Sequence, residues 1–370
     1  MSDVAIKVRD SVFRTTGMLD DTAAGLPFNR HNVDSFDLLT LRIEIEKILG
    51  KNIGDGDWTG FRTFQEIFDY CGLSHEPPKP VAGPTAARRL QINMPQMSVG
   101  GLSESWVFKE AGDFHWAKLA AALQKLSNEI TDEAGNRLYA TFLRFRLMSS
   151  HSLAEFAEND PLAIDNDLFR FGKGIFFSSC QFGSEGKAIK AELMSSFTSR
   201  TGSNKDLMKG DPILPANFSV PDSPGMPDFG AGYRDMRKGS GQQHELANES
   251  ITLTTDALFK CEYEINPYSD LNGVNLIYFA TYPLIADICE RRYVHQNPQA
   301  FAFKTDYAME ASTLARDVFY FGNLDVTDHI IYELNSFEVR DRNVVSQASL
   351  FRGSDKTLIA RIFSVKKRQA

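Results

Sequence analysis

Apolar residues recur at intervals of three and four positions through the first part of the chain, a spacing that predicts helices with one buried face. The pattern covers residues 3–17, 35–49 and 63–71, and a loop with glycine and proline occupies residues 25–32. Gly50 directly follows the second helical segment, as expected where a helix ends in a left-handed residue. We therefore predict that the chain begins with a small four-helix bundle containing one long early loop.

The hydrophobic pattern changes after residues 76–89, which read EPPKPVAGPTAARR and hold four prolines. That composition is typical of an extended linker. Beyond it, aromatic-rich runs of alternating apolar and polar residues predict antiparallel strands, and each set of strands follows one long helix. The helices are expected near 104–125 and 276–292. The strands are expected over 137–148, 174–182, 188–199, 257–265, 318–323, 328–340, 344–352 and 357–365.

A short internal similarity divides this second part of the chain. In the first copy, Ile92 precedes an asparagine and, after six further residues, Gly100. In the second copy, Ile265 stands in the same relation to Gly273. Each copy predicts a strand that ends at Ile-Asn, a turn that contains glycine, and an amphipathic helix. A helix wrapped by a curved antiparallel sheet is the hotdog arrangement, so the repeat predicts two hotdog units in tandem.

These patterns together predict an α+β protein with five segments. The helical bundle covers residues 1–75 and the linker covers 76–89. The two hotdog units cover 90–201 and 244–370. Residues 202–243, which are rich in Gly, Pro, Ser and Asp, are expected to form an insert that is mostly loop.

Charge and composition narrow the possible functions. The net charge of −8 argues against a nucleic-acid partner, whose binding protein would be basic. The first 76 residues carry 8 Lys and Arg against 13 Asp and Glu, so the bundle is the acidic part. Four scattered cysteines predict neither a disulfide framework nor a metal site. No apolar run is long enough for a membrane span and the charged start is unlike a signal peptide, so we expect a cytoplasmic location.

One hydroxyl stands at the start of the strongest predicted helix. Asp34 and Ser35 precede Phe36 there, and a carboxylate is favourable beside the partial positive charge of a helix N-terminus. An acyl carrier needs a hydroxyl at such an exposed position, where a prosthetic arm can be attached and can swing. Asp and Ser are also ordinary helix caps, so simple capping is the alternative.

Residues 31–50, HNVDSFDLLTLRIEIEKILG, resemble the Asp-Ser-Leu helix of acyl carrier proteins, with Phe36 where leucine is usual. The resemblance covers about seventy residues. It implies that a phosphopantetheinyl transferase attaches 4′-phosphopantetheine to Ser35 and that basic partner enzymes dock on the acidic helix surface.

Two glycine-containing turns are the candidate reaction sites of the hotdog part. Hotdog units usually handle acyl thioesters, with a helix N-terminus directed at the thioester carbonyl. Gly100 and Gly101 in the first turn and Gly273 in the second are therefore expected to supply backbone N–H groups to an oxyanion. Asp270 and Asn272 in the second turn are candidate catalytic or positioning groups.

The second turn also resembles a known pattern. Asp270, Gly273 and Tyr278-Phe279 are spaced like the Asp-containing turn of 4-hydroxybenzoyl-CoA-type thioesterases. The resemblance implies a catalytic role for Asp270, and Tyr268 is a further polar candidate. The alternative is that Asp270 only caps the helix.

Two longer segments carry another resemblance. NMPQMSVGGLSESWVFKEAGDFHW and GNRLYATFLRFRL resemble the double-hotdog bifunctional acyltransferase/decarboxylase of leinamycin-type polyketide biosynthesis. This implies a coenzyme A thioester substrate, methylmalonyl-CoA, which is decarboxylated before propionyl passes to an acyl carrier protein. It also implies that Tyr139 is the acyl-accepting nucleophile. A tyrosine needs local help for that role, for which Arg137, Lys109 or a helix N-terminus are candidates.

Several alternatives remain open from sequence. Tyr139 lies in a β-run and can serve packing alone, and His115 inside the first long helix is expected to be a packing residue. A thioesterase or dehydratase would depend on Asp270 in place of Tyr139. A non-catalytic module that docks the carrier would need neither. The expected partners are acyl-CoA, the transferase and a polyketide synthase or other acyl carrier, with no metal, nucleic acid or membrane.

Overall fold

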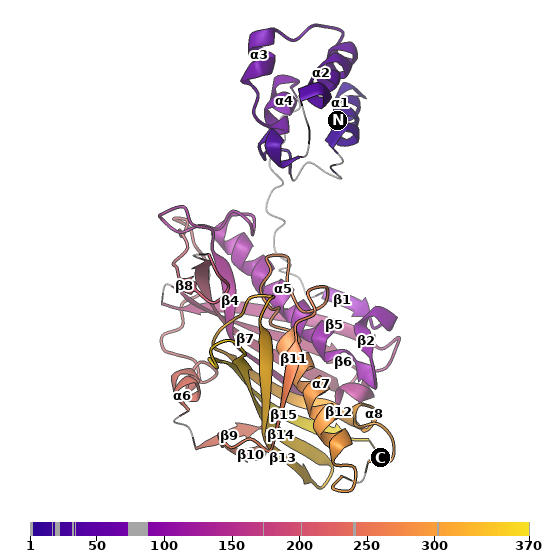
Figure 1. Ribbon diagram of the computed structural model, residues 1–370, viewed down its shortest axis with the longest axis vertical. Coiled ribbons are helices and arrows are strands. Elements are labelled where there is room, and N and C mark those ends of the chain that lie inside the picture. Colours follow the sequence, from indigo (N-terminus) through magenta and orange to yellow (C-terminus); the bar gives the residue numbers. More distant parts are fainter. Residues whose placement is uncertain are drawn as a thin grey trace. The chain divides into compact units, whose positions relative to one another are not determined.

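The computed structural model describes residues 3–16, 18, 23–31, 33, 35–72, 88–172, 174–200, 202–239, 242–301 and 303–369. The chain divides into two compact units, Met1–Lys79 and Pro80–Ala370 (Figure 1). Each unit has a hydrophobic core of its own.

The first unit is helical. Its helices are α1 (Asp3–Thr16), α2 (Ser35–Leu49), α3 (Asp55–Gly60) and α4 (Phe64–Tyr70). Leu41 and Ile45 of α2 pack with buried residues of α1 and α4, as their spacing of four residues requires. A capping box formed by Thr63 and Glu66 fixes the start of α4. A 3-10 turn (Phe28–Arg30) lies in the long loop between α1 and α2.

The second unit is built on an eleven-stranded antiparallel sheet with the strand order β1-β5-β6-β7-β4-β12-β15-β14-β13-β11, in which β8 also pairs with β7. The strands of its first half are β1 (Arg88–Gln91), β4 (Tyr139–Ser149), β5 (Pro161–Phe171), β6 (Ile175–Ser184), β7 (Lys187–Arg200) and β8 (Leu207–Lys209). Those of its second half are β11 (Phe259–Glu264), β12 (Ala311–Tyr320), β13 (His329–Arg340), β14 (Asn343–Arg352) and β15 (Leu358–Arg368).

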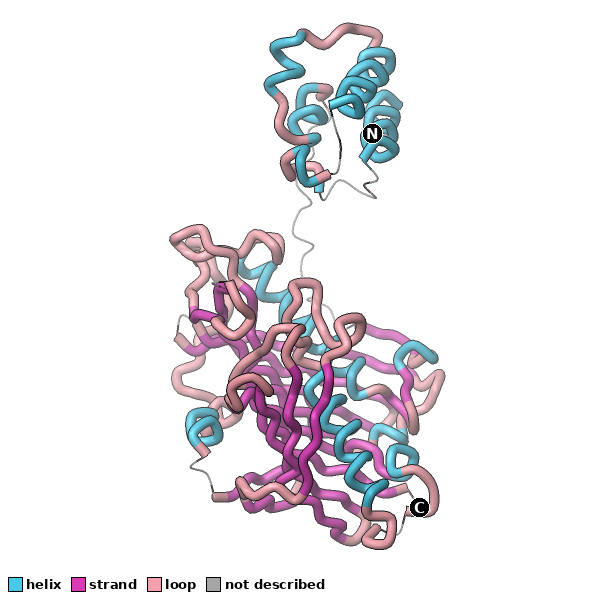
Figure 2. The backbone as a smooth tube through the Cα atoms, in the orientation of Figure 1, coloured by secondary structure: helices cyan, strands magenta, loops and turns pink. Residues whose placement is uncertain are grey.

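The two halves repeat one order of elements. The first runs β1, α5 (Glu104–Leu123), β4, β5, β6 and β7, and the second runs β11, α7 (Thr281–Gln296), β12, β13, β14 and β15. As the internal similarity predicts, β1 and β11 end directly before Ile92 and Ile265. The halves join where β4 pairs with β12, with Phe145 opposite Val318. Buried residues of α5 and α7 contribute to the same core as the sheet, and Figure 2 shows both helices along the curved strands.

Smaller elements complete the unit. The hairpin β2 (Met97–Ser98) and β3 (Gly101–Leu102) precedes α5, with a 3-10 turn (Met94–Gln96) before it and another (Leu153–Glu155) after β4. The insert contains β8 and α6 (Tyr233–Lys238), and the hairpin β9 (Gln243–Leu246) and β10 (Glu249–Thr252) follows it. A second apolar cluster joins this hairpin to β12, β14 and β15. The short helix α8 (Tyr307–Glu310) leads into β12.

Three expectations from sequence need correction. The strand β5 was not predicted, although its residues are buried in strict alternation from Pro161 to Asp167. The strand expected over 318–323 is β12, which begins earlier and ends at Tyr320. The helix expected from 276 begins only at Thr281, because a bridge between Leu271 and Ile277 holds the preceding residues in a loop.

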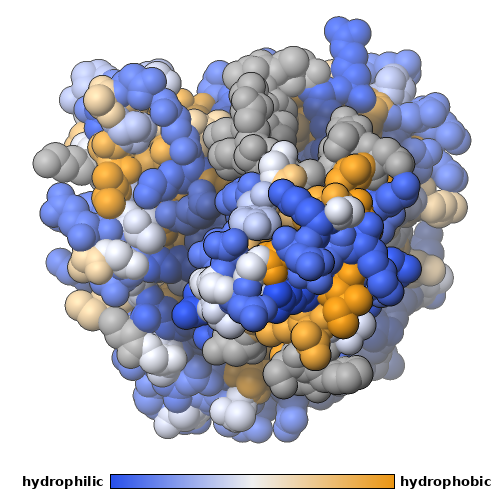
Figure 3. Space-filling view, turned by 90° about the horizontal axis from the view of Figure 1, so that it is seen from above, coloured by the Kyte–Doolittle hydropathy of each residue, from blue (hydrophilic) through white to orange (hydrophobic). Residues whose placement is uncertain are grey.

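The surface combines polar and apolar areas. On the face drawn in Figure 3, hydrophilic residues surround separate hydrophobic patches. In the first unit, Leu39 and Ile43 of α2 are among the exposed apolar side chains. Within the described ranges, no helix combines the length and the hydrophobicity that crossing a bilayer requires.

Candidate functional site

A cavity of about 570 Å³ lies in the second unit where the two halves meet. It is lined by residues of α5, the start of β4, the loop over residues 272–279, the end of β12 with residues 321–323, and the insert. Ser127, Arg137, Thr198 of β7 and Tyr282 of α7 complete the lining. Tyr139, Asn272 and Gly273, which the sequence singled out, all line this cavity although they come from different halves of the unit.

The inner walls of the cavity are mostly aromatic. Phe142, Phe279, Tyr282 and Tyr320 line it together with Trp116. The Tyr320 hydroxyl donates to the carbonyl of Phe279 at 2.9 Å, and the Tyr282 hydroxyl donates to a backbone carbonyl at 3.0 Å. Burial raises the pKa of both tyrosines above the ordinary range. These two phenols therefore hold the backbone in place and are unsuited to proton transfer near neutral pH.

Tyr139 lies beside two guanidinium groups. It begins β4 and pairs with Thr198 of β7. The guanidinium carbon of Arg137 lies 4.9 Å from the centre of its ring, and that of Arg200 lies 5.9 Å away. Cations over an aromatic face are attracted by its quadrupole, so both arginines fix the ring and place positive charge beside it. Lys109, the other cation considered from sequence, instead lies 5.9 Å from the ring of Tyr278.

The loop that carries Asn272 and Gly273 is held by its own hydrogen bonds. The Asn272 side-chain oxygen accepts from the backbone N–H groups of Val274 at 3.1 Å and Leu276 at 3.0 Å. Arg200 donates to the carbonyl of Val274 at 2.9 Å and so ties the loop to the end of β7. Among the described residues, neither the Asn272 amide nitrogen nor the Gly273 N–H has a protein acceptor. Both donors are available to a bound group.

Positive charge predominates around the cavity. Arg137, Lys205, Lys209 and Arg237 line it, against the single carboxylate of Asp113. In the part of the chain that the structure describes, no carboxylate forms an ion pair with Arg137, Lys209 or Arg237. This balance favours an anionic group, such as a phosphate or a carboxylate, at the cavity.

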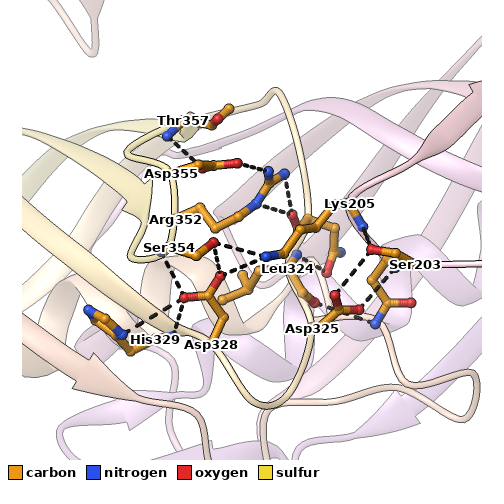
Figure 4. Close-up of polar contacts among 12 residues, drawn as sticks. Ser203, Lys205, Leu324, Asp325, Asp328, His329, Arg352, Ser354, Asp355 and Thr357 are labelled. Carbon is orange, nitrogen blue, oxygen red and sulfur yellow. Dashed lines mark hydrogen bonds and ion pairs between the residues drawn. The ribbon is translucent and has the colours of Figure 1, made fainter.

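A polar network anchors the start of the insert near the cavity (Figure 4). The side chain of Ser203 donates to Asp325 at 3.1 Å. Lys205 donates to Ser354 at 2.9 Å and lies 3.3 Å from Asp328. The network therefore connects the insert to the second hotdog half and fixes the segment that follows β12.

Other residues singled out from sequence lie outside the cavity lining. Asp270 is buried and accepts hydrogen bonds from the Tyr263 hydroxyl at 3.0 Å, the Asn266 backbone N–H at 2.8 Å and the Ser269 hydroxyl at 2.9 Å. These contacts hold the loop before α7. They differ from the helix cap considered as the alternative from sequence, because α7 begins only at Thr281 and its N-cap position is Ala280. Tyr268 is 98% exposed and also lies apart from the lining.

The glycines of the first turn have a different setting. Gly100 lies between β2 and β3 with a φ of 79°, Gly101 begins β3 with a φ of 137°, and neither lines the cavity. A Cβ at Gly101 would lie 2.3 Å from the carbonyl oxygen of Leu153, so this turn packs directly on the chain. In the internal repeat Gly273 is equivalent to Gly100, and a Cβ would meet no atom within 4 Å at either of these two positions.

His115 is a packing residue, as the sequence favours. Its ring nitrogens form hydrogen bonds with the hydroxyls of Ser178 and, at 2.7 Å, Ser195. Complete burial lowers its pKa to about 3, so the imidazole is neutral at physiological pH. Ser35 is the first residue of α2. Asp34 and the Ser35 side chain lie outside the described residues.

Sequence reasoning missed two contributors to the site. Arg200 contacts both Tyr139 and the loop at 272–276, and Asp113 provides the carboxylate at the cavity. Neither residue belongs to a motif that would single it out in the sequence. No cluster of His, Cys, Asp and Glu suited to a metal occurs among the residues described.

Comparison with known proteins identifies the fold. No family model matches the chain, and no curated protein sequence matches it. Among solved structures, a protein assigned as an oleoyl thioesterase from Lactobacillus plantarum superposes with a TM-score of 0.53 at 9% identity, covering 78% of this chain and 100% of that one. The 12:0-ACP thioesterase from Umbellularia californica gives a TM-score of 0.51 at 8% identity, covering 77% of this chain and 97% of that one. The second unit therefore has the hotdog fold with a large antiparallel sheet.

Proposed function

We propose that the protein is an acyl carrier joined to its own loading enzyme. The hotdog unit binds a malonyl-type thioester, methylmalonyl-CoA by the sequence resemblance, and removes its carboxylate. It passes the short acyl group through Tyr139 to phosphopantetheine on Ser35 or on another carrier. The chain contains both a helical unit with Ser35 at a helix start and a hotdog unit with a cationic cavity, and a proline-rich tether between them would raise the effective concentration of the arm.

The observation that carries the proposal is that Tyr139, Asn272 and Gly273 line one cavity. In the proposed reaction, the Tyr139 oxygen gives up its proton and attacks the thioester carbonyl, and coenzyme A leaves as its thiol. In this proposal the Asn272 amide nitrogen and the Gly273 N–H stabilise the oxyanion, which is supported by their position in the cavity lining and by their lack of a protein acceptor among the described residues. The guanidinium groups of Arg137 and Arg200 lie over the ring, hold it in place and put positive charge beside the reacting residue.

The remaining steps use the same donors. Loss of CO₂ from the tyrosyl ester leaves an enolate, which the oxyanion donors stabilise until it takes a proton and becomes the propionyl ester. The pantetheine thiol then attacks this ester, which transfers propionyl to sulfur and returns the proton to Tyr139. The cationic residues around the cavity would hold the carboxylate and the phosphates of the substrate.

A mass measurement on the full chain tests this proposal. The protein is first converted to its holo form by a phosphopantetheinyl transferase, then incubated with methylmalonyl-CoA, and the Ser35 peptide is weighed. We expect a propionyl group on the arm in the native protein. It should be absent in Ser35→Ala and strongly reduced in Tyr139→Phe, but retained in the matched control Tyr278→Phe. An unchanged mass on a fully phosphopantetheinylated protein would contradict the proposal.

Hydrolysis is the second candidate, because the exposed carboxylate of Asp113 lines the same cavity and could activate water. A thioesterase of this kind releases free acid and coenzyme A from acyl-CoA without loading Ser35. It would lose activity in Asp113→Asn and keep it in Tyr139→Phe.

The same assay on Asp270→Asn tests the thioesterase or dehydratase expected from sequence. Coenzyme A binding without turnover in any variant would indicate a docking module.

A further inference from the structure

One aromatic ring separates the cavity from the apolar core beneath it. Phe279 and Phe142 line the cavity, and their ring centres are 4.2 Å apart. Behind them, the rings of Phe108 and Phe145 stack at 3.7 Å, are fully buried and do not belong to the lining. The Phe279 ring lies 6.0 Å from that of Phe145 and 6.3 Å from that of Phe108. The ring of Phe279 thus lies between the cavity and this pair of buried rings, and we call it the floor of the cavity.

A glycine on α5 makes room for this ring. A Cβ at Gly112 would lie 2.5 Å from Cζ and 2.9 Å from Cε1 of Phe279, so any side chain there would displace the ring. The backbone of Phe279 is held as well, because its carbonyl accepts the hydroxyl of Tyr320 at 2.9 Å. The floor is therefore fixed from both sides, by a glycine below the ring and a hydrogen bond at its backbone.

We propose that Phe279, seated on Gly112, sets the length of the acyl chain that the cavity accepts. This inference rests on the proposed function, since it names the acyl class of the same site. With the ring in place, a chain that enters beside Tyr139 meets a wall of aromatic carbon. The site therefore selects short acyl groups and rejects medium-length ones. Removing the ring adds its own volume to the cavity and makes the apolar rings of Phe108 and Phe145 the new wall, which suits additional methylene groups.

The expected difference in affinity between short and longer acyl chains follows from how well each methylene group fits an apolar pocket. Each methylene that fits or fails to fit a pocket changes affinity by about 10-fold or more. The native protein should therefore prefer a propionyl over an octanoyl ligand by at least about 100-fold, and Phe279→Ala should reduce that preference to below about 10-fold. Gly112→Ala should weaken binding of both ligands, because the displaced ring enters the cavity.

Calorimetric binding of thioether analogues of propionyl-CoA and octanoyl-CoA to the full chain tests this inference without any need for turnover. Phe321→Ala is the matched control, since it removes a ring from another wall and should change both affinities alike. Phe279→Leu, expected to be intermediate, provides a second measurement if the alanine variant fails to fold. The same chain-length preference in the native protein and both Phe279 variants, or an equal change in Phe321→Ala, would overturn the inference. Absence of binding by either analogue to any form would overturn the proposed function and this inference together.

Discussion

His115 makes the stability of the hotdog unit depend on pH. The imidazole is fully buried on the inner face of α5, and burial lowers its pKa from 6.5 to about 3. In the unfolded chain the same group takes up a proton at its ordinary pKa. The stability is therefore complete above pH 6.5 and is lost progressively as the pH falls from 6.5 towards 3.

The change in the free energy of unfolding with pH follows from the uptake of one proton by His115 on unfolding. Below the unfolded pKa, the unfolded chain binds one proton more than the folded protein, which costs about 1.4 kcal/mol per pH unit. Between about pH 7 and pH 5, His115 should lower the free energy of unfolding by about 2 kcal/mol. Gln at this position can still form hydrogen bonds with Ser178 and Ser195 but does not titrate in this range. We expect His115→Gln to remove this part of the pH dependence.

Urea unfolding at several pH values measures the effect. A Trp58→Phe background restricts the fluorescence signal to Trp106 and Trp116, both of which lie on α5, the helix that carries His115. Carboxylates titrate in both proteins and cancel in the comparison. The native curve should fall by about 2 kcal/mol more than the His115→Gln curve between these pH values. Parallel curves would refute the assignment of a buried neutral imidazole.

Two further predictions concern other parts of the hotdog unit. Gly101→Ala places a Cβ 2.3 Å from a backbone carbonyl oxygen at a residue with a φ of 137°. It should therefore lower the free energy of unfolding by more than about 2 kcal/mol in the same urea assay. The control Gly273→Ala should change it by less than about 0.5 kcal/mol. The pKa of Cys261 is lowered to about 7 by a hydrogen bond from the Cys289 thiol and by Arg292. The rate of its alkylation by iodoacetamide should therefore reach half of its maximum near neutral pH. Cys289→Ala should move this midpoint to higher pH. A midpoint near the ordinary thiol value in the native protein would contradict this second prediction.

Local patterns predicted the elements better than the site. The period of four residues in α2 predicted its bounds, since one face of that helix is buried. The sequence pattern did not predict β5, because Asp165 and Asp167 on its exposed face lower its apparent β-propensity. The start of α7 was placed too early, because the apolar residues from Leu276 to Ala280 continue the helical pattern although they form a loop.

The composition of the cavity depends on contacts that no local pattern contains. Tyr139 and Asn272 both line it only because β4 pairs with β12 across the two halves. Arg200, at the end of β7, contacts Tyr139 and the carbonyl of Val274 and belongs to no distinguishing motif. The glycine repeat does not reveal that Gly273 of the second turn lines the cavity whereas Gly100 and Gly101 of the first turn do not.

The most direct measurement looks for the acyl group on the proposed nucleophile. In a Ser35→Ala protein the arm is absent, so an acyl group taken from methylmalonyl-CoA has no carrier in the same chain to accept it. Rapid acid quenching followed by peptide mass spectrometry should find an acyl ester on the peptide that contains Tyr139, and none in the matching peptide of Tyr139→Phe. Release of coenzyme A at equal rates from both proteins, with no ester on either peptide, would contradict the account.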